Sequence, residues 1–248
     1  MKKLILLALI AAATVSSQAA VMYDSMTGVS TYSTTGSSPA FLLADGATSF
    51  ASAGTGNHWE ISSIDFGAFY LGVQSWAAGA VVAKIDVYSS YDASSATNVM
   101  GPLAGSAFYS LPAVTTTSAA PNAAIGLTGA ALGTPIVLPS SATSLGFALG
   151  FFDAVSGARI STIRAAVSTA ALPTVGTSPI GFYRDADDNG IITSSEARTV
   201  TTNATSDNII IRFNATAVPD AVVPEPASFA VMGLGLLGLA ARRRRSSK

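Results

Sequence analysis

Cysteine is absent from this 248-residue chain, and histidine occurs once, at His58. Without cysteine there are no disulfide bonds, no thiolate nucleophiles and no zinc sites with sulfur ligands. A Ser-His-Asp triad would have to use His58, and the chain has no G-x-S-x-G motif to supply the serine. We therefore expect a non-enzymatic protein in which His58 is a turn residue at the start of a strand, with catalysis by His58 as the alternative.

Charged residues are also scarce, at 11% of the chain against about 25% in soluble domains. Between Ala20 and Asp220 there are six basic and 13 acidic residues, so this segment has a net charge of −7. Nucleic-acid binding needs a surplus of lysine and arginine to neutralise phosphates, which excludes it as a function. Alanine, serine, threonine and glycine predominate instead, and the last three are middling to poor helix formers.

Alternation of apolar and polar residues predicts strands along most of the chain. The clearest segments are 83–88 and 145–152, and the others are 59–66, 68–73, 107–111, 135–138, 159–164, 180–184 and 208–213. Turn-rich stretches separate them. Many short strands and no long helix predict an all-β fold for residues 20–216, a β-sandwich of jelly-roll type.

Residues 1–19 are typical of a signal peptide. Lys2 and Lys3 precede an apolar run over 4–13, and the small residues Ser17 and Ala19 precede the expected cleavage by signal peptidase. The apolar run is shorter than the roughly 17 residues that a membrane span needs, although an uncleaved anchor helix is the alternative. The segment therefore predicts export of residues 20–216.

The C-terminus has a different composition. A linker over 217–223 leads to Pro224-Glu225-Pro226, then to an apolar stretch over 227–241 and to four consecutive arginines, Arg242, Arg243, Arg244 and Arg245. Fifteen helical residues rise about 22 Å, so we expect a short transmembrane helix whose arginines snorkel on the cytoplasmic side.

This order of parts over residues 224–248 resembles the PEP-CTERM sorting domain. The resemblance implies recognition by an exosortase, a membrane-embedded cysteine transpeptidase or protease that cleaves near Pro224-Glu225-Pro226. It also implies a precursor held transiently in the inner membrane of a Gram-negative bacterium that makes exopolysaccharide and biofilm matrix. The mature protein would then reside at the cell surface or be secreted. The resemblance carries no information on residues 20–216.

Residues 185–196 match the calcium-loop pattern D-x-[DN]-x-[DN]-G-x5-E at every position. The expected ligands of a structural calcium ion are oxygens of Asp185, Asp187, Asn189, Ile191, Thr193 and Glu196. The loop resembles that of an EF-hand or dockerin, but residues 179–184 before it are typical of a strand and not of an entering helix. The alternative is a β-hairpin that turns at Asn189-Gly190, with solvated carboxylates.

The sequence thus predicts an exported, exosortase-sorted envelope or extracellular-matrix protein. One alternative is a carbohydrate-binding module for exopolysaccharide, in which Trp76, Tyr88 and Tyr91 stack on sugar rings. The other is a polysaccharide hydrolase that would use two scattered carboxylates. The candidates for that pair are Glu60, Asp65, Asp86, Asp92 and Asp153.

Overall fold

The computed structural model describes residues 19–27, 32–34, 43–95, 97–116, 122–129, 131–160, 162–168, 173–178, 182–184, 192–193 and 208–220. These residues form strands and turns and contain no helix, so the fold is all-β as predicted. The chain divides into two units, Met1–Val218 and Pro219–Lys248. The described strands belong to the first unit, apart from Pro219 at the end of the last strand.

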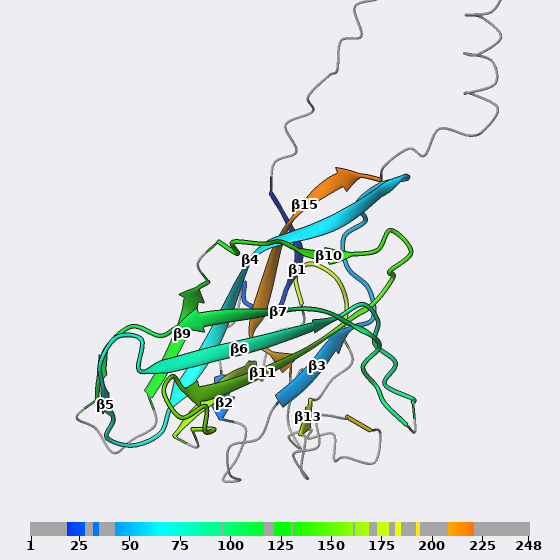
Figure 1. Ribbon diagram of the computed structural model, residues 1–248. Coiled ribbons are helices and arrows are strands. Elements are labelled where there is room, and N and C mark those ends of the chain that lie inside the picture. The colour runs from blue at the N-terminus through cyan, green and yellow to red at the C-terminus, as the bar shows by residue number, and fades with distance from the viewer. Residues whose placement is uncertain are drawn as a thin grey trace, which may run out of the picture. The chain divides into compact units, whose positions relative to one another are not determined.

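The larger sheet contains eight strands (Figure 1). Its main path runs in the order β1 (Ala20–Asp24), β15 (Ile211–Pro219), β4 (Asn57–Tyr70), β12 (Ile163–Ser168) and β14 (Asn208–Ile209). Off this path, β9 (Asn122–Thr128) and β10 (Ile136–Leu138) pair with β4, and β2 (Tyr32–Thr34) pairs with β12.

The second sheet has five strands, in the order β13 (Tyr183–Arg184), β3 (Leu43–Ala47), β11 (Leu145–Asp153), β6 (Val81–Tyr88) and β7 (Leu103–Ser110). Its strands are antiparallel neighbours, and β11 pairs with β6 over the whole length of β6. Two short strands, β5 (Ser75–Trp76) and β8 (Val114–Thr115), form a separate ribbon. In Figure 1 the layer of β7, β6, β11 and β3 lies across β4 and β15.

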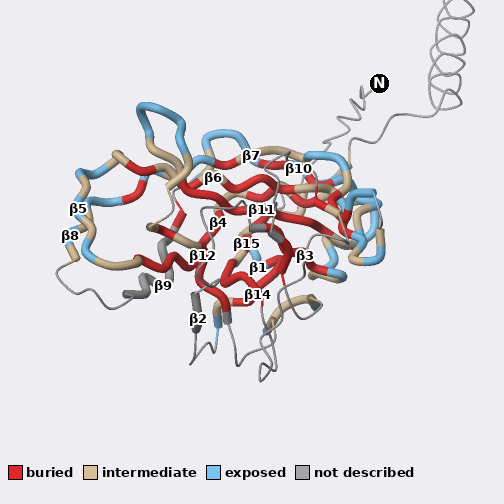
Figure 2. The backbone as a smooth tube through the Cα atoms, turned by 90° about the horizontal axis from the view of Figure 1, so that it is seen from below, coloured by how far each residue is buried: buried red, intermediate tan, exposed pale blue. Residues whose placement is uncertain are grey.

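Aromatic and aliphatic side chains from both sheets meet in one core. The ring of Phe147 on β11 lies 5.4 Å from that of Phe213 on β15, and Phe66 on β4 lies 6.3 Å from Phe151 on β11. All four side chains are at most 4% exposed. Figure 2 shows these buried strands in the middle of the body and exposed loops around them. The two layers make the fold β-sandwich-like, while the jelly-roll connections stay a prediction.

Strand β4 joins two segments that the sequence predicts as separate strands, 59–66 and 68–73. The strand continues through Gly67, whose N–H donates to the carbonyl of Ile210 at 2.9 Å. A Cβ at Gly67 would lie 2.9 Å from the Cβ of Ala166 and 3.1 Å from that of Ile210. Glycine is therefore required here, because the side chains of these two neighbouring residues leave no room for another side chain.

The sequence missed the strands β3 and β9 and the short strands β2, β5 and β8. It placed β12 four residues too early, at 159 instead of Ile163. Strand β15 ends at Pro219, so it includes the start of the expected linker over 217–223. The expected signal peptide, apart from Ala19, and the expected transmembrane helix over 227–241 lie outside the described residues. Within the described ranges, no helix has the length and apolarity needed to cross a membrane.

Candidate functional site

A pocket of about 340 Å³ opens where the chain enters β4 and where it leaves β10. Two loops form it, the connection from β3 to β4 and the connection from β10 to β11. Its lining residues are Ser49, Phe50, Ala51, Ser52, Ala53, Gly54, Asn57, His58, Trp59, Pro139, Ser140, Ala142 and Thr143. The volume lies at the lower end of the range for small-molecule sites.

Side-chain hydrogen bonds shape the first of these loops. The indole N–H of Trp59 donates to the carbonyl of Ala51 at 2.7 Å, and the amide of Asn57 donates to the carbonyl of Ala53 at 2.9 Å. Gly54 has φ of +90°, a conformation that favours glycine, and its N–H donates to Ser52 Oγ at 3.1 Å. The loop is therefore wrapped against the start of β4, with Trp59 only 6% exposed.

The lining combines aromatic rings with neutral hydrogen-bonding groups. It contains no aspartate, glutamate, lysine or arginine, and its one titratable side chain is His58. His58 Nε2 lies 3.5 Å from a carboxylate oxygen of Glu60, the residue two positions along the same strand. Hydroxyls, an amide and aromatic faces without a fixed charge suit a neutral ligand that has both polar and apolar surface.

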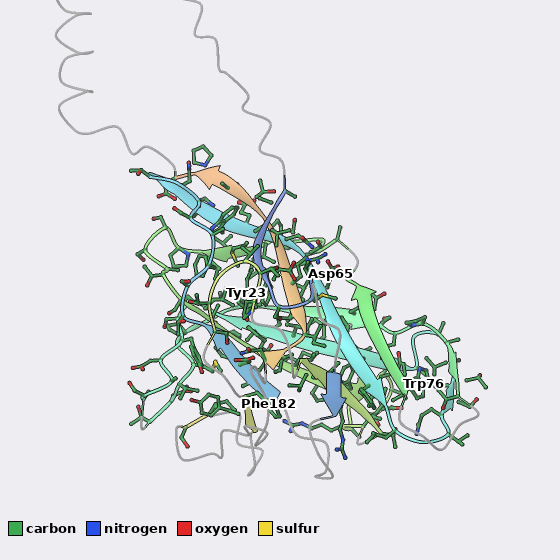
Figure 3. The ribbon with its side chains drawn as sticks, turned by 180° about the vertical axis from the view of Figure 1, so that it is seen from behind. Tyr23, Asp65, Trp76 and Phe182 are labelled. Carbon is green, nitrogen blue, oxygen red and sulfur yellow. The ribbon has the colours of Figure 1, made fainter. Side chains whose placement is uncertain are left out.

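The three aromatic residues predicted to stack on sugars do not line this pocket. Trp76, which lies in β5 of the short ribbon, packs on Tyr70 at 5.5 Å between ring centroids (Figure 3). Tyr91 is 6% exposed, and its ring lies so close to Gly46 that an added Cβ would overlap the ring. Tyr88 packs, half-buried, against the same cluster of buried residues. All three cover buried surface, and the aromatic residues of the pocket are Phe50, His58 and Trp59.

Each of the scattered carboxylates has its own polar partners. Asp86 binds Lys84 and Ser106, and Asp65 accepts a hydrogen bond from Asn214 at 3.1 Å. Asp92 and Asp153 cap their own turns through Ser94 and Ser156. Glu60 lies beside His58. No group of three or more histidine, aspartate or glutamate side chains that could hold a metal ion occurs among the described residues.

The expected calcium loop is described only at Ile192 and Thr193. The other predicted ligands, Asp185, Asp187, Asn189, Ile191 and Glu196, lie outside the described residues, and Thr193 is half-buried. One residue before the loop and one residue within it contact the connection from β6 to β7. The Tyr183 hydroxyl donates to the carbonyl of Ala93 at 3.2 Å, and the N–H of Val99 donates to the carbonyl of Ile192 at 2.7 Å.

Directly before the loop, Tyr183 and Arg184 form strand β13, within the segment that the sequence predicts as a strand. Ile192 is 1% exposed and packs with Tyr91, Val99 and Met100. Ile192 of the loop thus belongs to a small second core on the outer face of the five-stranded sheet.

A fully buried carboxylate, Asp45 on β3, was missed by the sequence analysis. It accepts hydrogen bonds from the N–H groups of Gly46 at 2.7 Å and Ile209 at 3.0 Å, and weaker ones from Ser178 and Asn208. Burial raises the pKa of Asp45 to about 7 despite these donors. Burial and then the charge of Asp45 raise the pKa of the neighbouring Tyr23 hydroxyl far above its usual range.

The sorting motif Pro224-Glu225-Pro226 and the arginines Arg242 to Arg245 lie outside the described residues. Comparison with protein families finds a match to the PEP-CTERM protein-sorting motif over residues 222–245. No curated protein and no solved structure matches the chain. The motif implies exosortase-dependent sorting of an exported protein, with a membrane-anchored precursor and processing by exosortase. The chain is therefore a PEP-CTERM domain-containing protein.

Proposed function

We propose that the chain is a non-enzymatic protein of the cell envelope or extracellular matrix of a Gram-negative bacterium that produces exopolysaccharide. The sorting motif at residues 222–245 carries this proposal, together with a cysteine-free, β-sandwich-like body. In this pathway signal peptidase removes residues 1–19, and the apolar stretch over 227–241 holds the precursor in the inner membrane. Exosortase then acts near Pro224-Glu225-Pro226, and the body reaches the cell surface or is released.

Substitution of the motif's acidic residue tests the sorting step. With Glu225→Ala in the full-length chain, the body should stay in the inner-membrane fraction. The wild-type body should be released from this fraction. Asp220→Ala, which changes the nearest other acidic residue outside the matched motif, should be sorted normally. Mass spectrometry of the mature wild-type protein should show a C-terminus without residues 227–248. If these residues are still attached, the processing step is wrong.

A structural calcium ion in the loop over 185–196 is a second part of the proposal. It is supported by the complete match to the ligand pattern and by the burial of Ile192, a residue within the loop. A bound ion would add rigidity to an exported domain that has no disulfide bonds. Sensor and extracellular calcium loops have weak to moderate affinities, so millimolar calcium outside the cell would fill the site.

Thermal unfolding of the full-length chain in calcium and in chelator tests the ion. At calcium concentrations of about 100 times the Kd, the fold should gain about 2.7 kcal/mol, which corresponds to several degrees. Asp185→Ala should remove the gain, because it deletes a charged ligand. Asp153→Ala is the matched control, since Asp153, the half-buried last residue of β11, is remote in sequence from the loop. Identical melting curves with and without calcium would favour the hairpin at Asn189-Gly190.

Carbohydrate binding is the second candidate function, and the pocket between the two loops favours it. A sugar ring offers an apolar face to Phe50 or Trp59 and hydroxyls to Ser140, Thr143 and Asn57. The lining contains no aspartate, glutamate, lysine or arginine, which favours a neutral sugar. The proposed ligand is thus an uncharged segment of exopolysaccharide.

The two tryptophans of the chain make this testable by fluorescence, because Trp76→Phe leaves Trp59 as the single reporter in the pocket wall. Titration with cellobiose, maltose and lactose to tens of millimolar should give a saturable change of emission for at least one sugar. The double variant Ser140→Ala/Thr143→Ala should weaken that change, and Ser110→Ala, outside the pocket, should not. A flat titration with all three sugars contradicts the proposal.

A further inference from the structure

Strand β7 is the edge strand of the five-stranded sheet. Its pairing with β6 is interrupted by a bulge at Ala104, but the regular segment from Gly105 to Ser110 lacks the features that usually protect an edge. Strand β7 pairs with β6 on one side, and none of the described strands pairs with its other side. Its eight residues include no charged residue and no proline. Natural proteins keep such edges short, charged or interrupted by proline, because an exposed edge is a template for pairing with another chain.

The hydrogen-bonding pattern of β6 and β7 identifies the backbone groups at the free edge. The N–H of Leu111 donates to the carbonyl of Val81 at 2.8 Å, directly after β7. In an antiparallel pair, hydrogen-bonded and non-hydrogen-bonded positions alternate. Counting back from Leu111, the N–H and C=O groups of Ser110, Phe108 and Ser106 therefore face away from β6.

Phe108 lies at the centre of these three positions and is 67% exposed. Its register partner on β6 is Lys84, and the ammonium of Lys84 lies 2.8 Å from a carboxylate oxygen of Asp86. The two charges next to the edge thus compensate each other. An approaching strand meets a locally neutral surface with one large apolar ring.

We propose that β7 pairs with β7 of a second copy of the chain, antiparallel about a two-fold axis at Phe108. This register places Phe108 opposite Phe108 of the second copy, and Ser106 opposite Ser110. The N–H groups of all three residues then meet carbonyls of the other copy, and the two exposed rings form a cross-strand aromatic pair. The five-stranded sheets of two bodies become one continuous sheet.

The absence of cysteine makes the register directly measurable. Directly opposed residues of a hydrogen-bonded antiparallel pair have Cα atoms about 5.5 Å apart, within the range that a disulfide spans. Phe108→Cys in the full-length chain should therefore form a covalent dimer under mild oxidation. Val155→Cys, at a turn residue that is 96% exposed, should stay largely monomeric. Equal cross-linking of the two variants would overturn the proposal.

A second variant tests the proposed pairing by charge repulsion. Phe108→Lys places two ammonium groups opposite each other and should abolish the dimer in sedimentation experiments in detergent, whereas Val155→Lys should leave it intact. A dimer that survives Phe108→Lys, or a wild type that is monomeric, overturns the proposal. If the monomer shows slow hydrogen exchange at Ser106 and Phe108, another part of the same chain covers the edge.

Discussion

Asp45 and Asp24 are both nearly inaccessible to solvent, but their pKa values shift in opposite directions. Asp45 on β3 is fully buried, and its hydrogen bonds come from neutral groups, since no ion pair joins it to a described lysine or arginine. Burial is the largest influence on it and raises its pKa to about 7. Neutral donors alone do not compensate the loss of hydration of a fully buried carboxylate.

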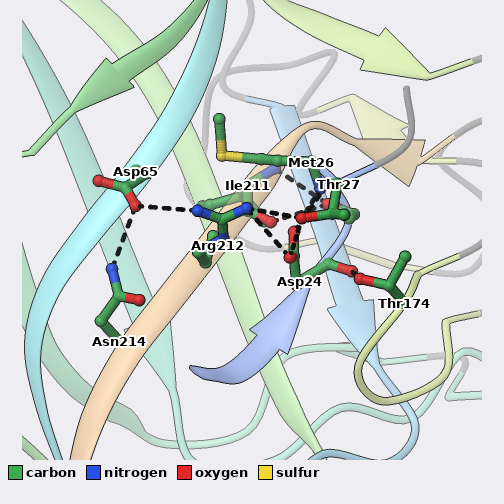
Figure 4. Close-up of polar contacts among 9 residues, drawn as sticks. Asp24, Met26, Thr27, Asp65, Thr174, Ile211, Arg212 and Asn214 are labelled. Carbon is green, nitrogen blue, oxygen red and sulfur yellow. Dashed lines mark hydrogen bonds and ion pairs between the residues drawn. The ribbon is translucent and has the colours of Figure 1, made fainter. Parts of the chain in front are cut away.

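Asp24 at the end of β1 is 4% exposed and has stronger partners (Figure 4). Burial would raise its pKa, but hydrogen bonds from the Thr27 hydroxyl at 2.6 Å, from the N–H groups of Met26 and Thr27, and from Arg212 outweigh it and lower the pKa. Arg212 lies between two carboxylates, 3.1 Å from Asp24 and 3.9 Å from Asp65. The comparison shows that a cation and short hydrogen bonds from nearby donors decide whether the pKa of a buried carboxylate rises or falls. Low exposure alone does not decide it.

The largest expected effect is the loss of the Asp45 carboxylate. Asp45→Ala leaves the N–H groups of Gly46 and Ile209 buried without their acceptor, and each unpaired group costs about 1–3 kcal/mol. With the cavity, we expect a loss of about 3–5 kcal/mol in the free energy of unfolding at pH 5. Chemical denaturation measures it, with Asp153→Ala, at a half-buried carboxylate that caps its own turn, as control. A loss no larger than the control would show that water replaces the carboxylate.

The raised pKa of Asp45 predicts a pH dependence that Asp24 does not share. Between about pH 4 and pH 7 the folded state keeps the proton that the unfolded state has released, so stability from this group falls as the pH rises. A difference of about three pH units corresponds to a loss on the order of 4 kcal/mol. Asp45→Asn should remove this decline, even if it costs stability at pH 5. Parallel stability curves of wild type and Asp45→Asn across this window would contradict the raised pKa.

Sequence reasoning reached the all-β fold because period-2 alternation is a local signal, as at 83–88 and 145–152. It did not find Asp45, because the burial of this residue depends on Ile209, which is 164 positions away along the chain. The pocket escaped it for the same reason, since its two loops are distant in sequence and come together only through the pairing of β10 with β4. The sorting motif was found because all of its parts are contiguous.

Asp24→Asn should have a smaller effect and the opposite pH profile. Because the pKa of Asp24 is lower in the folded state, Asp24 stabilises the fold at pH values above its pKa in the unfolded state, which is near 4. This stability is lost as the pH falls through the lower pKa of the folded state. The variant weakens the contacts to Arg212 and Thr27, so we expect a loss of about 1–2 kcal/mol at pH 7. Denaturation at pH 7 and pH 3 measures it, and the difference from wild type should shrink at pH 3. If the difference in stability between the variant and the wild type is the same at pH 7 and pH 3, the loss comes from packing and not from the charge of Asp24.

The smallest effect is expected at Lys84, which adds an intermediate case to the comparison. Lys84 binds Asp86 at 2.8 Å, but its side chain is 35% exposed, and Asp86 also accepts a hydrogen bond from Ser106. Arg212, in contrast, lies near two carboxylates, and its side chain is less exposed, at 29%.

Water and salt screen an ion pair at the surface, so Lys84→Met should cost less than about 1 kcal/mol in the free energy of unfolding, and the cost should decrease further in 1 M salt. Denaturation at low and high salt, with Lys84→Arg as the charge-preserving control, measures this. A loss of several kcal/mol that salt does not reduce would place Asp86 with Asp24, as a buried carboxylate that depends on its cation.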